Sequence, residues 1–360
     1  MNKYRFFTII LLFISIIFLQ NCDKRRNEWR YGVSISAPKM LGTADEVFSK
    51  DNIRVFRMVN SLNFSLLNQP RGIFDSSFLF SPASVLEAFY SLDDQTYISI
   101  LKDKFNVTDT LDLYSNFSTI RKLCSEIDST LKNTNEITIN NNKEIFIKQE
   151  IEFPLVTGEV YSKKILPFYT QNQEQEMEFF SIQGEMGMFS DKNLNVFDIS
   201  IGNGNYSLLI IYPKNHDVKN LTDFFTESDY KINVESLVTQ VGNITFPNIS
   251  DKNNYSIFLS FPVLDLNSRA MSTTINSSIN IIEPTLAEIS IKKENLDRTI
   301  INKTKSESFL IDHPFLYFIR DRHSNFIIAT GLFCGIGKSA SRQPTFTFPN
   351  GSIGFPKSLF

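Results

Sequence analysis

The chain has little of what an enzyme or a disulfide scaffold needs. Its 360 residues include 3 cysteines, 3 histidines and 1 tryptophan, and so few cysteines cannot form a network of disulfides. The sequence contains no Gly-x-Ser-x-Gly, His-Glu-x-x-His or Cys-x-x-Cys motif. It therefore predicts a protein that is not an enzyme and that binds no metal and no small-molecule cofactor.

Neither sign of charge is in large excess. The 36 basic and 39 acidic residues leave a formal net charge of -3, which argues against a general surface for nucleic acid or anionic membranes. With 42% hydrophobic residues, the chain is able to fill a large core. We expect a globular protein with no nucleic-acid partner.

The N-terminus has the layout of a secretory signal. Lys3 and Arg5 precede an apolar run at residues 6–19, and polar residues follow. The run is short for a bilayer span, and the order of charged and apolar parts is typical of a signal peptide. We assign residues 1–22 to a signal peptide and expect a secreted, extracellular protein. The alternative is a membrane-anchored protein, held by an uncleaved N-terminal segment or by a lipid on Cys22.

Asparagine-linked glycosylation signals agree with export. Candidate acceptors in Asn-x-Ser/Thr sequons are Asn63, Asn106, Asn116, Asn205, Asn220, Asn243, Asn248, Asn254, Asn276, Asn302 and Asn350. A chain rich in Asn and Ser also produces sequons by chance, so their occupancy stays open. Cys124 and Cys334 either form one disulfide or remain two buried thiols.

The spacing of apolar residues predicts an α+β fold. Residues 45–69 have helical periodicity. Phe78–Phe80 predict a short strand, and Ser81 with Pro82 predicts the start of a second helix. After about residue 135, short apolar runs bounded by Gly, Asn and Pro predict strands. Helices followed by strands favour the α+β class.

The most specific pattern lies near the C-terminus. The stretch SFLIDHPFLYFIRDRHSNFIIATGLFC has two apolar runs joined by a charged turn and entered through Asp-His-Pro. It resembles the C-terminal signature of the serpins, the serine protease inhibitor superfamily. The matching residues are Phe309, Asp312, His313, Pro314, Phe315, Phe318, Ile319, Arg320, Ile328 and Gly331.

Other stretches resemble the serpins in the same order along the chain. FLFSPASVLEAFYSL is similar to a serpin segment in which a strand enters a helix, and Ser81, Pro82 and Ser84 match its Ser-Pro-x-Ser. The resemblance covers one serpin-like domain at residues 45–335 and leaves an irregular tail at residues 336–360. It implies a serpin-like α+β fold, with N-terminal helices and several mixed or antiparallel β-sheets.

The resemblance also implies a mechanism. A serpin holds a reactive-centre loop above its main sheet, and a protease that cleaves this loop is trapped when the loop inserts as an extra strand. The scissile bond would lie shortly before Phe309, at Lys303-Thr304 or, as second choice, at Arg298-Thr299. A basic residue there suits the acidic pocket of a trypsin-like protease. The implied partner is therefore an extracellular trypsin-like serine protease, bound by a monomeric inhibitor.

The chain departs from the serpin pattern around the main sheet and the loop. Few residues separate IFIKQEIEF from LPFYT, where serpins have a helix and a central strand. We therefore expect a reduced main sheet that lacks one strand beside the insertion site.

The expected hinge of small residues is also missing, and Lys292, Lys293 and Glu294 stand in this region. If AEISIKKEN is the strand that feeds the loop, only residues 296–308 remain for the loop. A glycan on Asn302 would also obstruct a protease at Lys303. The alternative function is a non-inhibitory interaction or storage protein with a degenerate, short reactive loop.

Overall fold

The structure is a computed structural model. It describes residues 49–67, 77–90, 131–140, 144–155, 160–170, 173–202, 204–218, 222, 225–250, 255–261, 271–282, 307–336 and 345–347. The chain divides into two compact units, residues 1–37 and 38–360, and all described residues belong to the second. The expected signal peptide and the loop strand AEISIKKEN lie outside the described residues.

The expected helices at residues 45–69 and after Ser81 are confirmed. The described helices are α3 (Lys50–Leu67), α4 (Pro82–Tyr90) and α8 (Glu227–Glu235). The Ser84 amide donates to Ser81 Oγ at 3.4 Å, as expected for a serine that precedes the first turn of a helix. None of these helices is both long and apolar enough to cross a membrane.

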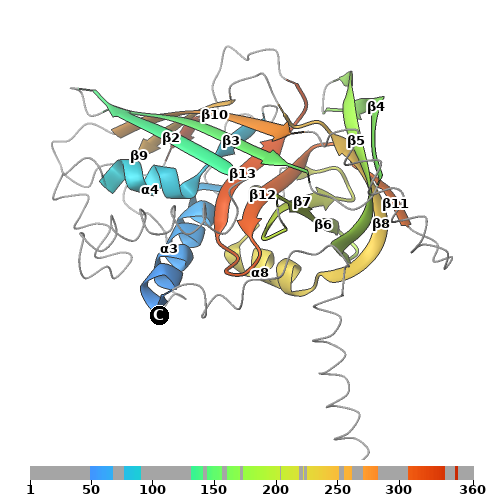
Figure 1. Ribbon diagram of the computed structural model, residues 1–360. Helices are drawn as coiled ribbons and strands as arrows, with labels where there is room; N and C mark the ends of the chain where they lie inside the picture. Colours follow the sequence, from blue (N-terminus) through green and yellow to red (C-terminus); the bar gives the residue numbers. More distant parts are fainter. Residues whose placement is uncertain are drawn as a thin grey trace, which may run out of the picture. The chain divides into compact units, whose positions relative to one another are not determined.

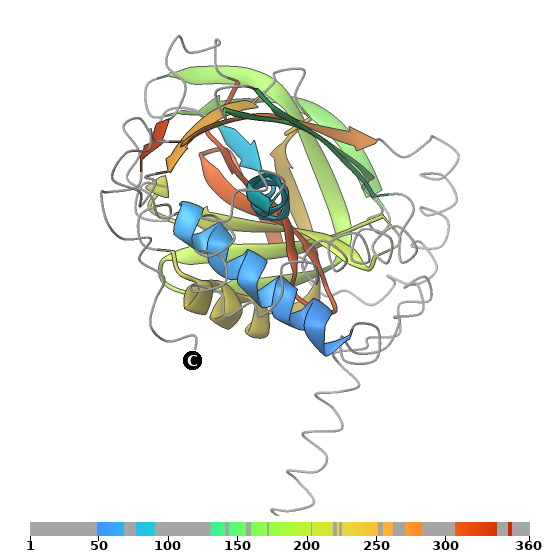
Figure 2. The same cartoon turned by 90° about the vertical axis from the view of Figure 1, so that its left-hand side faces the viewer.

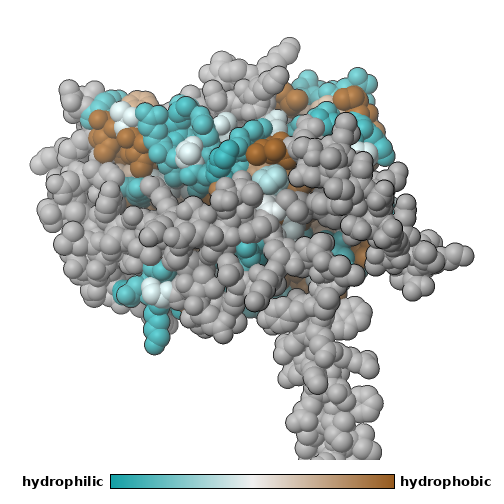
Figure 3. Space-filling model, viewed as in Figure 1, coloured by the Kyte–Doolittle hydropathy of each residue, from teal (hydrophilic) through white to brown (hydrophobic). Residues whose placement is uncertain are grey.

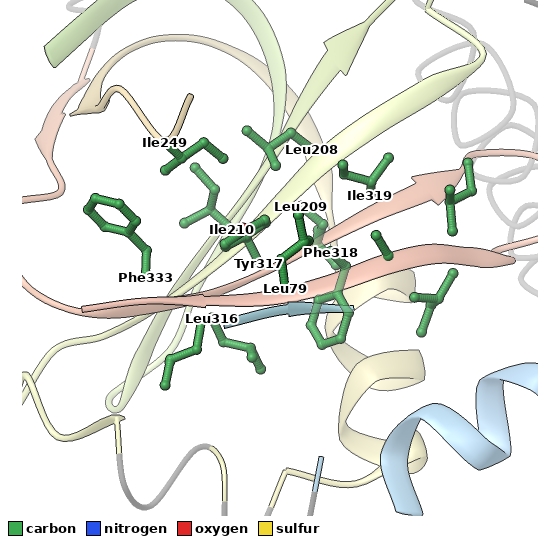
Figure 4. Close-up of a cluster of buried hydrophobic side chains, with 14 of the residues drawn as sticks. Leu79, Leu208, Leu209, Ile210, Ile249, Leu316, Tyr317, Phe318, Ile319 and Phe333 are labelled. Atoms are coloured by element: carbon green, nitrogen blue, oxygen red, sulfur yellow. The ribbon is translucent and has the colours of Figure 1, made fainter. Parts of the chain in front are cut away.

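A nine-stranded sheet contains most of the described strands. Its order is β1-β13-β12-β7-β6-β5-β8-β11, and β4 pairs with β5. The strands are β1 (Phe78–Phe80), β4 (Val160–Tyr169), β5 (Glu174–Ser190), β6 (Leu194–Ile201), β7 (Tyr206–Pro213), β8 (Val238–Pro247), β11 (Glu307–Leu310), β12 (Phe315–Asp321) and β13 (Ile327–Phe333). Every residue of β7, β12 and β13 is buried, and Figure 4 shows side chains from these strands gathered in one cluster. The two apolar runs of the C-terminal signature are thus the buried neighbouring strands β12 and β13.

A five-stranded sheet has the order β14-β9-β10-β3-β2. Its strands are β2 (Lys132–Ile139), β3 (Ile145–Pro154), β9 (Tyr255–Phe261), β10 (Met271–Ile282) and β14 (Thr345–Thr347). Helix α4 contacts both β3 of this sheet and β13 of the nine-stranded sheet, and Figures 1 and 2 show it between them. β14 adds an edge strand from the tail, which the sequence predicted to be irregular.

One ion pair lies inside the nine-stranded sheet. Arg320 on β12 and Asp198 on β6 are 4% and 2% exposed, and two hydrogen bonds of 2.8 and 3.2 Å join them. Burial by itself would raise the pKa of Asp198, but Arg320 and Arg322 outweigh burial and hold this pKa below its ordinary value. The pair is therefore charged at neutral pH and connects β6 to β12 across β7.

We expect Asp198→Asn to destabilise the fold by about 3–5 kcal/mol, because it leaves the buried Arg320 charge without its carboxylate. Urea unfolding followed by circular dichroism at pH 7 measures this. Glu235→Gln, which removes an exposed ion pair with Lys231, is the control and should change nothing measurable. An unchanged midpoint for Asp198→Asn would contradict the assigned role.

The signature glycine Gly331 is explained by its partner in the sheet. Gly331 lies directly opposite Tyr317, and a Cβ at this position would stand 2.1 Å from Tyr317 Cζ. The tyrosine ring covers the glycine backbone, so no larger residue fits here. Gly331 therefore sets the packing between β12 and β13.

Gly331→Ala should destabilise the protein by about 3 kcal/mol or prevent folding, because the tyrosine ring cannot leave a close-packed core without strain. Gly242→Ala is the matched control. Its added Cβ would meet Met188 Sδ at 2.9 Å, the end of a flexible side chain. Equal urea midpoints for the two variants would show that the ring does not require the glycine.

Candidate functional site

The candidate site begins at the pairing of β3 with β10, which we call the seam. The two strands run parallel, and Thr273–Ile282 pair one to one with Ile145–Pro154. In this five-stranded sheet β10 lies between β9 and β3, so it has a hydrogen-bonded parallel neighbour along ten residues.

The inner side of the seam is apolar except at one level. Ile147, Ile151 and Phe153 of β3 are buried opposite Ile275, Ile279 and Ile281 of β10. Between these pairs, Gln149 lies opposite Ser277, and each is 1% exposed. Neither Gln149 Oε1 nor Ser277 Oγ has a hydrogen-bond partner. Each unsatisfied group weakens the core by about 1–3 kcal/mol, so this level is a weak point of the seam.

The signature residues Ser81, Pro82 and Ser84 lie on the inner side of this sheet. Ser81 and Ser84 are 1% exposed, and their helix α4 contacts β3. Ser84 Oγ is also buried without a hydrogen-bond partner. The sequence placed these residues at the start of a helix, and the structure adds that this helix supports the seam.

The outer side of the seam is charged and exposed. Phe146, Lys148 and Glu150 are exposed on β3, and Lys148 lies 2.8 Å from Glu150. Figure 3 shows a largely hydrophilic surface along the edge where β2 and β3 run. No element among the described residues covers this side, in agreement with the short sequence between IFIKQEIEF and LPFYT.

The second part of the site is the connection from β10 to β11. The last described residue of β10 is Ile282, and β11 begins at Glu307. All four scissile candidates, Lys303, Thr304, Arg298 and Thr299, lie outside the described residues and stay predictions. β11 is held by parallel pairing with β8, and Phe309 packs its ring 5.0 Å from that of Phe197.

The turn after β11 contains the Asp-His-Pro signature. Tyr212 Oη donates to Asp312 Oδ1 at 3.0 Å, and the Tyr169 amide donates to the Asp312 carbonyl at 2.7 Å. Burial, followed by the Asp312 carboxylate, raises the pKa of Tyr212, so this hydroxyl stays a donor. Pro314 is buried and leads into β12. Asp312 thus joins the end of β4 and Tyr212 of β7 to the turn that leads into β12.

Burial corrects part of the glycosylation prediction. Asn63 is 0% exposed and accepts a hydrogen bond from Thr330, and Asn205 is 3% exposed. The folded chain has no room for a glycan on either. Asn276 is exposed, and Asn243 and Asn248 are partly buried, so these three stay candidates. Outside the described residues lie Asn106, Asn116, Asn220, Asn254, Asn302 and Asn350.

Only one of the two cysteines in the disulfide prediction lies among the described residues. Cys334 is 6% exposed, and its amide donates to Ser77 Oγ at 2.9 Å. Cys124 lies outside the described residues. Both alternatives, a disulfide and two buried thiols, therefore stay open.

The sequence alone predicted neither the buried polar pair Gln149 and Ser277 nor the strand β10. β10 reads MSTTINSSINII, in which isoleucines alternate with Asn and Ser. The alternation is a strand signal, but the high content of Ser, Thr and Asn is also typical of loops.

We expect Ser277→Ala to stabilise the protein by about 1 kcal/mol, because it removes a buried hydroxyl that has no partner. Ser278→Ala, one residue further on the outer side of β10, is the control and should leave the urea midpoint unchanged. A loss of stability in Ser277→Ala would mean that the hydroxyl is satisfied in solution.

Comparisons with known proteins agree with this arrangement. Residues 160–335 match the family model Serpin (serine protease inhibitor). The chain is 22% identical over 188 residues to an uncharacterized serpin-like protein of Methanosarcina mazei, and the match covers 46% of this chain and 43% of that protein. It thus spans less than half the length of this relative.

Solved structures share the fold. The mouse protein-Z dependent protease inhibitor has a TM-score of 0.58 at 11% identity, covering 80% of this chain and all of that one. A tumour suppressing serpin has a TM-score of 0.55 at 12% identity, covering 79% of this chain and all of that one. The match of residues 160–335 to the Serpin family model, together with the fold shared with solved serpins, supports placing this chain in the serpin superfamily.

Proposed function

We propose that this protein is a secreted serpin-type inhibitor of a trypsin-like serine protease, with residues 283–306 as the reactive loop. The observation that carries the proposal is the parallel pairing of β10 with β3. A loop segment that turns back from the end of β10 and enters the seam would run antiparallel to both strands. Both of its edges would then be hydrogen-bonded, which makes the seam a suitable acceptor for a new strand.

The first part of the loop has a pattern that fits such a strand. Ala287, Ile289 and Ile291 alternate with Leu286, Glu288, Ser290 and Lys292. A turn over residues 283–285 would place Ala287 opposite Ile281, Ile289 opposite Ile279, and Ile291 opposite Ser277. These β10 residues point inward, so the alanine and the isoleucines would face the core. Residues 286–292 thus have the alternation of an inserting strand, although they lack the small residues of the serpin hinge.

The length of β10 favours one scissile bond over the other. β10 has 12 residues, and in the same register residues 286–297 would pair with its full length. Arg298 is the next residue and would carry a trapped protease to the far end of the sheet. Lys303 would leave several unpaired residues between the inserted strand and the protease. Arg298-Thr299 is therefore our preferred bond, ahead of Lys303-Thr304, which the sequence favoured.

The test is incubation of the secreted protein with trypsin, followed by denaturing gel electrophoresis. We expect a covalent complex with the wild type and its loss in Arg298→Ala. Lys303→Ala is the matched control, since it removes a basic residue from the same loop, and it should still form the complex. Cleavage of the wild type without any complex would refute inhibition, and loss of the complex only in Lys303→Ala would move the scissile bond to residue 303.

A non-inhibitory interaction or storage protein is the second candidate, and Lys293 favours it. In the register above, Lys293 follows Ile291 on the inward side and would lie opposite Ile275. Burial of its charge there is unfavourable, so insertion would stop after Ile291. In that case, cleavage of the loop would leave the melting temperature nearly unchanged, whereas full insertion would raise it strongly.

Export is proposed on the N-terminal sequence. The charged and apolar parts of residues 1–22 support cleavage and secretion, and we propose a monomer because one inhibitor chain would trap one protease. Secretion from a eukaryotic host cell, followed by N-terminal sequencing, tests where the chain is cleaved.

A further inference from the structure

Three aromatic rings from three separate elements form a stack beside the β11–β12 turn. His313, in that turn, lies between Tyr169 at the end of β4 and His216 in the turn after β7. The ring centroids are 5.2 Å apart for Tyr169 and His313 and 3.5 Å apart for His216 and His313. Two histidine rings in face-to-face contact tolerate each other as neutral groups, but two imidazolium ions would repel.

Hydrogen bonds fix the position of the central ring. His313 Nδ1 lies 2.7 Å from Asp312 Oδ1, within hydrogen-bond distance of the carboxylate. Asp312 also accepts from Tyr212, as described above. His216 belongs to the turn that follows β7, where its amide donates to the Pro213 carbonyl at 3.1 Å.

The charged groups of the described residues around the stack lie on the turns that form it. Asp312 and His313 are the groups that act on His216 electrostatically, and the raised pKa of Tyr212 keeps its hydroxyl uncharged at neutral pH. Lys214 lies in the same turn, but its amine donates to Ser190 Oγ at 2.8 Å and to the Asp191 carbonyl. The His216 ring is thus held against His313, and Asp312 is the described carboxylate that acts to offset a second positive charge.

We propose that the Tyr169–His313–His216 stack is an acid-sensitive clamp that holds the β11–β12 turn at neutral pH and releases it in mildly acidic surroundings. β11 is a four-residue strand at the edge of its sheet, and it follows directly after residues 283–306. Release of the turn loosens β11 and with it the C-terminal attachment of these residues. The clamp acts on the fold itself and does not depend on the proposed inhibitory function.

The direction of the pH effect follows from His216. Partial burial, followed by His313, holds the pKa of His216 below its ordinary value, and Asp312 opposes this only in part. The open state therefore binds a proton more readily than the stacked state. The stabilisation is complete above a pH of about 6.5, the ordinary histidine value, and is lost as the pH falls toward the lowered value. Glu227 has the opposite effect, since burial raises its pKa.

The test compares hydrogen exchange of a peptide covering residues 307–314 at pH 7.5 and 5.5, corrected for intrinsic exchange rates. In the wild type we expect faster opening at pH 5.5, by at most about tenfold per pH unit, because one proton is involved. His216→Phe keeps an aromatic ring that cannot be protonated and should remove the pH dependence. A wild type with equal exchange at both pH values would overturn the proposal.

Two further variants complete the test. His323→Gln is the matched control, because His323 is the third histidine of the chain and bonds Asn205 in the β12–β13 turn. It should keep the wild-type pH dependence. His216→Asn suits the left-handed backbone at this position, φ 61°, and should give fast exchange at both pH values because the stack is absent. A pH dependence that survives in His216→Phe or disappears in His323→Gln would contradict the clamp.

Discussion

The position of β12 between β7 and β13 is the constraint on which the rest of the structure depends. Its residues are all buried, so the charge of Arg320 needs a partner in the same layer, and Asp198 of β6 provides it. The turn that follows β12 holds helix α3, because Asn60 donates to the Asn325 carbonyl and accepts from the Ile327 amide. Helix and sheet are therefore positioned by the same few polar contacts inside an apolar core.

The seam between β3 and β10 differs from that core in physical character. The strands pair well along their backbones, yet the inner side carries two polar atoms without partners at Gln149 and Ser277, and the outer side is exposed. A protein that only had to be stable would gain from apolar residues at this level. The unsatisfied polar atoms of Gln149 and Ser277 are consistent with a sheet that has to open between β3 and β10. The proposed inhibitory function requires such an opening.

The Asp-His-Pro turn connects the core to the loop region. Asp312 holds the end of β4 through the Tyr169 amide and orients His313, and His313 stacks on both Tyr169 and His216. The end of β4, the turn after β7 and the β11–β12 turn meet at this point. Protonation of His216 therefore affects the turn that holds the end of β11. The residues that identify the family are thus also the residues around which a local pH response is built.

The sequence by itself was enough to indicate the resemblance to serpins, the α+β class and the two apolar runs of the C-terminal signature, because these are local patterns that need no partner to be recognised. It also placed α3, β1 and α4, where periodicity and a capping serine coincide. Only the tertiary structure decided which strand neighbours β10, that Asn63 and Asn205 are buried, and that His216 meets His313. These facts depend on contacts between residues far apart in the chain, and strand register and burial are set by the packed core as a whole.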